Sequence, residues 1–344
     1  PSLALYADII QNPAFRAEDF QRAQAQQVSG IQQSNRNPGA IASRVLAANV
    51  FGPENPYGRP VSGSEASVQS LTPADAEAYH ATWFRPDNAT LVVVGDTTQV
   101  ELAPALEKAF RTWRAPSTPL PVKPAAPALP SQSAPRVLIV DRAGPQSSIT
   151  AGRLAPAFDA ASEGPIEVVN TALGGAFTSR INMNLREDKH WSYGAGSGIR
   201  TTRGERMFLV STGVQSDKTA ESLVEIRKEL TDVVGSRPLS ETELSAVRSN
   251  LVLGMAGNWE TNAAVAGDLT NMVVYGVPEN YYDGYAASVN GTTPQSASVA
   301  ARAIVGDGPT TWVVVGDRAA IEPKIRALNL GEVQVVDTEG RPVN

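Results

Sequence analysis

The chain has 344 residues, which is long for one domain and fits two. Hydrophobic residues make up 42% and charged residues 19%, so a packed core is expected and extensive disorder is not. The formal charge is −6 and no basic run alternates with aromatic residues, which argues against a nucleic-acid partner. No apolar run reaches membrane-spanning length, and the lack of cysteine excludes disulfides, cysteine-ligated zinc and cysteine nucleophiles.

The first residues already follow a helical pattern, with apolar side chains at Leu3, Leu5, Tyr6 and Ile9. No initiator methionine or signal peptide precedes this pattern. We therefore expect the chain to start inside a domain, as a processed or truncated product or as one piece of a larger assembly.

A proline-rich segment divides the sequence. Seven prolines fall between Pro116 and Pro135, mixed with Ala and Ser, and such a segment is extended and has no core of its own. The predicted division is a first domain at 1–115, a linker at 116–135 and a second domain at 136–344.

The two sides of this linker resemble each other. Thr72-Pro73 leads to a Val-Val-Val-Gly-Asp run that ends at Asp96, and Thr293-Pro294 leads to the same run ending at Asp317, with an offset of 221 residues at both ends (293 − 72 and 317 − 96). Each copy predicts a helix with Thr at the N-cap, then a buried strand, then a second helix. Upstream, Glu18-Asp19-Phe20 corresponds to Thr242-Glu243-Leu244. We interpret the chain as two copies of one unit, the first lacking its beginning.

The second copy predicts strands followed by helices without a strict alternation. Helical stripes run through Ile166, Val169 and Leu173, and again from Leu223 to Val233, and Ser240 opens a further helix with a capping box. Strands are expected at 136–141, 147–153, 197–202 and 206–214. The predicted fold class is α+β, with a mixed, mostly antiparallel sheet and helices packed on it in each domain.

One stretch of the second copy places an arginine and a tyrosine seven residues apart across a turn. Gly174 and Gly175 allow a close backbone approach or a positive φ. Phe177, Ile181 and Leu185 follow at helical spacing, with Arg186 near the end of that helix and Tyr193 at the start of a strand. On spacing alone, Arg186 capping the helix C-terminus and Tyr193 as an ordinary strand residue is the simpler interpretation.

The pattern Leu-Gly-Gly-x-Phe-x-Ser-Arg, followed by Leu-Arg-Glu-x-x-x-x-Ser-Tyr, resembles the second domain of the pitrilysin/insulinase family of zinc metallopeptidases, the inverzincins. The resemblance covers about 14–315. It implies paired α+β domains and a non-catalytic half in which Arg186 and Tyr193 contact the substrate backbone beside the glycine-rich loop at Gly174 and Gly175.

The zinc site of that family has no counterpart here. The family's catalytic half carries His-x-x-Glu-His, and this chain has only His80 and His190, far apart. The helix that resembles the carrier of the family's third ligand has Ser29 and Gly30 at that place, with no acidic residue between Asp19 and Glu54. His80 is expected to be a surface or partly packed residue, and His190 an exposed turn residue that could also face the chamber. We expect no cofactor in this chain and zinc in a partner half.

The resemblance implies a chain that is inactive alone and forms, with a zinc-bearing half, a chamber that cleaves peptides or unfolded segments. The partner would be a separate chain or a cleaved part of the same precursor, and no nucleic acid or membrane segment is expected. The alternative is a non-proteolytic scaffold subunit of the same fold, like the core subunits of respiratory complexes. Leu-Arg-Glu followed by Trp-Ser-Tyr-Gly is similar to exported bacterial members, which suggests a periplasmic protein.

Overall fold

The computed structural model describes residues 2–131, 134–306 and 308–343, which form two compact units. Unit 1 comprises Pro1–Gln33, Val61–Ala125 and Trp259–Val273. Unit 2 comprises Ser34–Pro60, Ala126–Asn258 and Val274–Asn344. Each unit is thus built from separate stretches of sequence. The division into duplicated domains around a linker at 116–135 stays a prediction.

Unit 2 contains one mixed sheet whose strand order is β3-β4-β2-β5-β1-β6. The pairs from β3 to β5 are antiparallel, and β1 pairs in parallel with β5 and β6, as expected for a mostly antiparallel mixed sheet. The strands are β1 (Arg136–Asp141), β2 (Gln146–Ala155), β3 (Ser192–Arg200), β4 (Arg206–Gln215), β5 (Thr311–Gly316) and β6 (Glu332–Val336).

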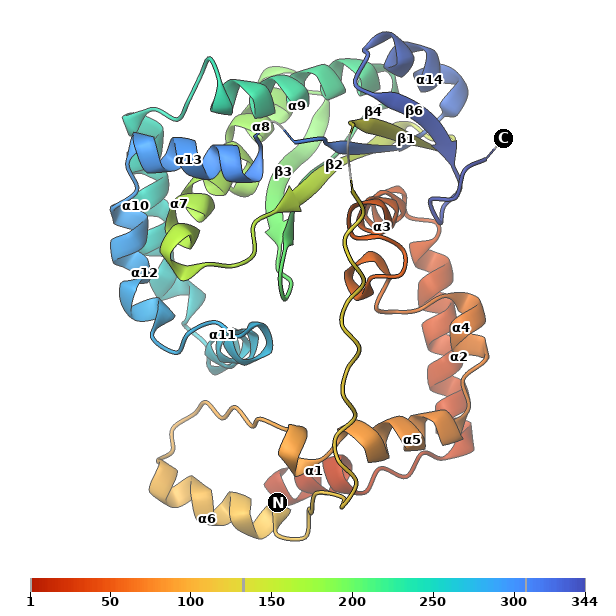
Figure 1. Ribbon diagram of the computed structural model, residues 1–344, viewed down its shortest axis with the longest axis vertical. Helices are drawn as coiled ribbons and strands as arrows, with labels where there is room; N and C mark the ends of the chain where they lie inside the picture. The colour runs from red at the N-terminus through yellow and green to blue at the C-terminus, as the bar shows by residue number, and fades with distance from the viewer. Residues whose placement is uncertain (1, 132–133, 307, 344) are drawn as a thin grey trace. The chain divides into compact units, whose positions relative to one another are not determined.

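Both faces of this sheet are covered, and side chains alternate between two cores. Val137 and Val314 join the larger core, and Leu138 and Val313 join the smaller one. Helix α3 (Pro38–Phe51) packs on the smaller-core face, and α7, α9 and α13 lie on the other (Figure 1). The helices that contribute to the larger core are α7 (Ala160–Asn170), α9 (Thr219–Val234), α10 (Glu241–Asn258), α12 (Tyr281–Asn290), α13 (Pro294–Ile304) and α14 (Arg318–Ala327).

The local signals of the second copy are confirmed. The stripe of α9 is buried from Leu223 to Val233, and Gly235 follows its end. At the start of α10, the Glu243 N–H donates to Ser240 Oγ (3.3 Å) and the Ser240 N–H donates to the Glu243 carboxylate (2.9 Å). Gly204 takes a φ of 102° between β3 and β4, a conformation that suits glycine.

Unit 1 consists of helices with a small core. Tyr6 packs edge-on against Phe110, and the Gln24 side chain donates to the carbonyl of Val68 (2.8 Å). The only buried apolar side chains of its described residues are Ala7, Ile31, Val68 and Met272. Its helices are α1 (Ser2–Gln11), α2 (Ala17–Ser34), α4 (Glu65–Gln69), α5 (Pro73–Trp83), α6 (Gln99–Phe110) and most of α11 (Asn262–Tyr275).

The strand predicted at the end of the first copy is not formed. Residues 91–95 have no regular structure, and Leu91 and Val93 are 44% and 45% exposed. All strands of the described residues belong to the sheet of unit 2, so this run has no neighbouring strand to complete its hydrogen bonds. The prediction of a buried strand at Leu91–Asp96 is therefore wrong.

Candidate functional site

The stretch from Thr171 to Asp188 is helical but wound more widely than an ordinary α-helix. It contains the π-helical turns η3 (Thr171–Gly175) and η4 (Met183–Asp188), with the short helix α8 (Arg180–Asn182) between them. Gly174 lies against β3, where a Cβ atom would come within 2.4 Å of the Ser197 nitrogen. Of the two proposed functions of these glycines, close approach therefore applies at Gly174, since neither glycine has a positive φ.

Charged side chains anchor this stretch to neighbouring helices. Arg180 donates to both carboxylate oxygens of Glu243 (2.7 and 2.9 Å) and to the carbonyls of Arg237 and Pro238. Partial burial opposes ionisation of Glu243, but hydrogen bonds from Arg180 and Ser240 outweigh it and lower its pKa to about 2. The start of α10 thus fixes α8 through a charge-assisted, two-pronged contact.

Arg186 rests on an aromatic ring at the surface. Its guanidinium carbon lies 4.6 Å from the centre of the Phe177 ring, and its Nε lies 3.3 Å from Glu187 Oε1. Ile181 and Leu185 are buried as predicted, but Phe177 is 58% exposed, so its assignment to the same buried stripe is wrong. The reason is that Phe177 precedes α8, and its ring supports the arginine through a cation–π contact.

The chain then reverses into β3 through two irregular conformations. His190 has a φ of 57°, and its Nδ1 lies 3.1 Å from the carbonyl oxygen of Arg186. The register between β3 and β4 shifts between Ser192 and Ala195, which marks a β-bulge. Ser192 Oγ accepts from the Gly194 N–H (3.0 Å) and lies 2.8 Å from the carbonyl oxygen of Gly213, and Asn182 Oδ1 accepts from the Ala195 N–H (3.1 Å).

Tyr193 lies inside this bulge and is 88% exposed. Its hydroxyl has no hydrogen bond within the described residues, and neither a hydrogen bond nor a cation–π contact joins Tyr193 to Arg186 there. The two residues therefore occupy the same helix-to-strand turn, but their side chains do not interact with each other. The bulge directs the phenol outward from β3, which is the last strand at its end of the sheet.

No set of side chains in the described part of the chain matches a metal site. No three His, Cys, Asp or Glu residues gather closely enough to hold an ion there. His80 is a packed residue, since its Nε2 lies 2.8 Å from the Ile10 carbonyl oxygen and its ring stacks on Phe84. Ser29, at the position of the missing acidic ligand, donates to the carbonyl of Ala25 within α2. These residues do not fit zinc.

The sequence matches a known family over this region. A family model described as the peptidase M16 inactive domain matches residues 70–251, more than half of the chain. The chain belongs to this family. The match includes the Arg186–Tyr193 turn and confirms the resemblance to zinc metallopeptidases.

Curated relatives of this M16 chain carry the name of zinc proteases. An uncharacterized zinc protease of Mycobacterium tuberculosis is 25% identical over 256 residues, which is 73% of this chain and 58% of the relative. One of Streptomyces coelicolor is 23% identical over 91% of this chain and 68% of the relative. The chain thus spans less than two thirds of the mycobacterial relative.

Solved structures share the fold of this M16 chain. A peptidase M16 inactive domain from Pseudomonas fluorescens matches with a TM-score of 0.81 and 22% identity, over 92% of this chain and 74% of that chain. A protease from Helicobacter pylori matches with a TM-score of 0.82 and 20% identity, over 92% and 76%. These matches confirm the predicted fold class of a mixed sheet with helices packed on it. The sheet expected in the first domain is not formed, because all strands of the described residues belong to the sheet of unit 2.

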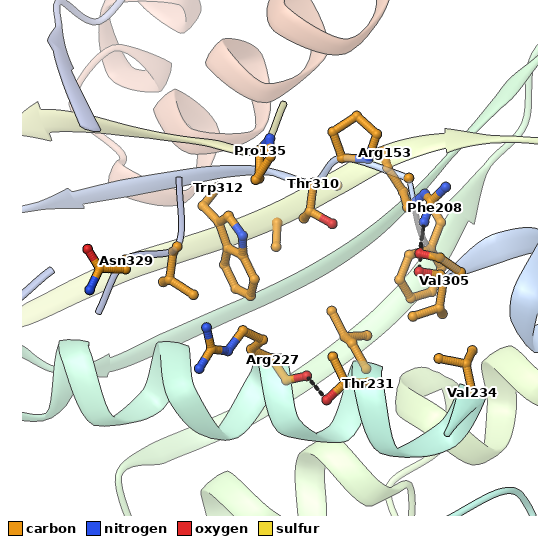
Figure 2. A pocket seen from close by; sticks show the side chains of 17 residues that line it. Pro135, Arg153, Phe208, Arg227, Thr231, Val234, Val305, Thr310, Trp312 and Asn329 are labelled. Atoms are coloured by element: carbon orange, nitrogen blue, oxygen red, sulfur yellow. Dashed lines mark hydrogen bonds between the residues drawn. The ribbon is translucent and has the colours of Figure 1, made fainter. Parts of the chain in front are cut away.

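A cavity of about 420 Å³ lies between the M16 sheet and α9 (Figure 2). Trp312 forms part of its wall, and the Arg153 guanidinium donates to the carbonyls of Val305 (2.7 Å) and Gly306. Its described wall carries arginines and hydroxyls but no carboxylate, imidazole or thiol. The described part of the wall therefore supplies no acid–base pair for hydrolysis.

Buried charged and phenolic groups gather between α7 and α12. Arg206 pairs with Glu163 at 2.7 Å, and burial raises the pKa of Glu167, which accepts a hydrogen bond from Tyr285. Burial also raises the pKa of Tyr281 and Tyr285. These groups pair with one another inside the fold, although Glu163 Oε2 and Arg206 Nη2 are buried without a hydrogen-bond partner, so the arrangement is that of a packed but incompletely satisfied polar network.

Sequence reasoning missed the residues that shape the Arg186–Tyr193 turn. Ser192 and Asn182 hold the bulge, and Phe177 supports Arg186. The Ser-Tyr-Gly triplet was the available signal, because a glycine inside a predicted strand often marks a bulge. Asn182 gave no such signal, since its partner lies on another element.

Proposed function

We propose that this chain is the substrate-binding, non-catalytic half of a zinc-dependent metalloendopeptidase, completed by a zinc-bearing partner half in a heterodimer. The observation that carries the proposal is the exposed phenol of Tyr193, held on a β-bulge seven residues after an arginine supported by Phe177. A phenol that is exposed and free of hydrogen bonds is available to a ligand.

The substrate would bind as an extended peptide along β3. This strand has β4 as its neighbour on one side and ends the sheet on the other. Unpaired backbone groups at such an edge recognise an added strand. A Cβ atom built on Gly194 or Gly198 would meet nothing within 4 Å, so the sheet face has open space at these two positions of β3.

Arg186 and Tyr193 would then have different roles. Arg186 offers several N–H donors to substrate carbonyl oxygens and keeps the peptide in register. Tyr193 offers one O–H donor, which lowers the barrier if it contacts the carbonyl oxygen that gains negative charge during hydrolysis. The zinc chemistry belongs to the partner half in this proposal, because the residues of this chain do not fit the metal.

The test combines the chain with a half that carries His-x-x-Glu-His and follows cleavage of an unstructured fluorogenic peptide. Tyr193→Phe should lower kcat about 10²–10³-fold if the hydroxyl contacts the reacting oxygen. Arg186→Ala should raise KM as well as lower kcat, because it removes a contact to bound substrate. Tyr79→Phe and Arg22→Ala are matched controls, since both residues are exposed in unit 1.

Unchanged kcat/KM in both Tyr193→Phe and Arg186→Ala, with partner association intact, would contradict the proposal. The scaffold alternative would then be preferred. A respiratory-complex chain with the same fold is the observation behind that alternative. A chain of complex III2 from Candida albicans matches with a TM-score of 0.75 at 13% identity, over 94% of this chain and 79% of that chain.

We propose that this chain and its partner half are located in the bacterial periplasm. The periplasmic protease PqqL from Escherichia coli shares the fold with a TM-score of 0.70 and 14% identity, over 88% of this chain and a third of that chain. No described helix is both long and apolar enough to cross a bilayer. Fractionation of the producing cells would test the location, and recovery with cytosolic markers would contradict it.

A further inference from the structure

A polar groove lies on the α3 face of the sheet, beside the bulge that carries Tyr193. Its volume is about 480 Å³, and all of its lining residues belong to unit 2. The N-terminal turn of α3 forms one wall, and neighbouring strands β2, β3 and β4 form the floor. Gly194, the residue after Tyr193, lines it, and so does Gly213, whose carbonyl oxygen lies 2.8 Å from Ser192 Oγ.

Four hydroxyl groups face this groove without a partner. Ser43, Ser148, Thr150 and Ser211 line it, and none has a side-chain hydrogen bond within the described residues. Thr150 and Ser211 are opposite each other across β2 and β4, and Ser148 is opposite Gly213, so these residues share one sheet face. Thr150 is only 2% exposed. Its hydroxyl oxygen is not among the buried unsatisfied atoms, so it is open to the groove, where a water molecule or ligand can satisfy it.

The groove favours negative charge. Helix α3 is 14 residues long, its N-terminal turn contains no acidic side chain, and Pro38 and Gly39 of that turn line the groove. A helix N-terminus carries a partial positive charge and attracts anions. No carboxylate stands among the lining residues, and the glycines at 39, 194 and 213 leave the backbone accessible.

We infer that this groove binds a carboxylate of the peptide substrate, either the C-terminal carboxylate or an Asp or Glu side chain. The four unpartnered hydroxyls supply donors for such an anion, and the positive end of the α3 dipole favours it, although Pro38 has no N–H and the Ala40 N–H already donates to Asn37 Oδ1. The assignment of this carboxylate to a peptide substrate rests on the proposed function, because the groove shares Gly194 with the strand along which the substrate would lie. Free phosphate has the same acceptor chemistry and is the competing source.

Direct binding tests this without the partner half. Fluorescence anisotropy would compare labelled unstructured peptides that differ only in a C-terminal carboxylate or amide, or in an internal Asp or Asn, with inorganic phosphate as competitor. The carboxylate forms should bind about tenfold more tightly than their neutral counterparts, a difference of about 1.4 kcal/mol. Phosphate should displace them only at concentrations far above that of the peptide.

Three variants at two positions locate the effect. Ser43→Asp should abolish the preference for the carboxylate by adding a negative charge, whereas Ser43→Asn, which differs only in charge, should keep it. Thr150→Val should weaken the carboxylate peptide and leave the amide peptide unchanged. Its Tm should not fall, because the replaced hydroxyl has no protein partner.

Equal affinity for the carboxylate and amide forms, or equal binding by Ser43→Asp and Ser43→Asn, would overturn the inference. Tight binding of phosphate that displaces the peptide at similar concentrations would overturn the peptide assignment. These outcomes are separate from the cleavage test. A preference for the carboxylate in a pair whose cleavage ignores Tyr193 and Arg186 would contradict the peptidase proposal and support an anion-binding groove.

Discussion

The segments Thr72–Asp96 and Thr293–Asp317 begin alike and end differently. Both start with a Thr N-cap, a capping box and proline in the first turn, and both form a helix of 11 residues. In the second segment the Val-Val-Val-Gly run becomes β5, fully buried between β1 and β2. In the first, the same run has no regular structure and is partly exposed.

The difference separates local from non-local causes of structure. A capped helix satisfies its backbone groups within itself, so the same residues give the same helix in both units. A strand needs at least one neighbouring strand, and the β-branched run of the first segment has none among the described residues. The same division holds for the helices: α13 is buried against α7 and α9, whereas α5 has no fully buried side chain.

The largest expected contrast lies at the corresponding residues Val93 and Val314. Val314 is 0% exposed and pairs with Ile139 and Ile149, whereas Val93 is 45% exposed. Val314→Asp buries an unpaired charge and should cost more than about 4 kcal/mol or prevent folding. Val93→Asp should change the free energy of unfolding by less than about 0.5 kcal/mol. Urea unfolding followed by circular dichroism measures both.

Alanine substitutions keep this contrast measurable if Val314→Asp does not fold. Val314→Ala should cost about 2–3 kcal/mol through the cavity it leaves, and Val93→Ala almost nothing. Equal losses at the two positions would mean that residues 91–95 pair as a strand in solution, and the comparison would fail.

An intermediate contrast is expected at the corresponding acids Asp19 and Glu243. Glu243 holds Arg180, whose side chain is 8% exposed, whereas Asp19 pairs with Arg22 at the surface. Glu243→Gln should cost about 1–3 kcal/mol, because it leaves a mostly buried guanidinium without its counter-charge. Asp19→Asn should cost less than about 0.5 kcal/mol. Chemical denaturation at pH 7 compares them, and equal costs would contradict the contrast.

The pH dependence of unfolding gives a second measurement of Glu243. Its folded-state pKa of about 2 lies below its ordinary value of 4.5. A lowered carboxyl pKa contributes stability above pH 4.5, and that contribution is lost as the pH falls towards 2. The carboxylate is 36% exposed, so solvent screening reduces the effect. Glu243→Gln should flatten the stability profile between these pH values, and an unchanged slope would exclude the ion pair as its source.

Periodicity and turn residues predicted most of unit 2 from the sequence. The stripes of α7 and α9, the capping box at Ser240 and the turn at Gly204 depend on neighbours within a few positions, which a sequence shows directly. The packing of α3 on the sheet of β2 and β5 was not predictable, because it joins residues about a hundred or more positions apart.

The candidate site was predicted by motif rather than by geometry. Arg186 and Tyr193 were chosen from a family pattern, and the structure places them in one turn. Spacing did not reveal the bulge, the exposed ring of Phe177 or the link from Asn182 to Ala195, since each depends on tertiary contacts. The polar groove on the α3 face could not be predicted from the sequence either, because its residues come from four elements.

The smallest expected effects concern the two helix caps, where the segments agree. Thr72→Ala and Thr293→Ala each remove a hydroxyl that accepts from the N3 amide, at 3.3 Å from Asp75 and 3.2 Å from Ser296. Each should destabilise its own helix by about 1 kcal/mol. Hydrogen exchange should show similar loss of protection in the first turns of α5 and α13. Only Thr293→Ala should also lower global stability, because α13 buries Ala297, Ala301 and Ile304 in the core whereas α5 buries no side chain. A global loss from Thr72→Ala equal to that from Thr293→Ala would show that α5 is integrated into a core as α13 is, and the separation of local from non-local causes would not hold for these helices.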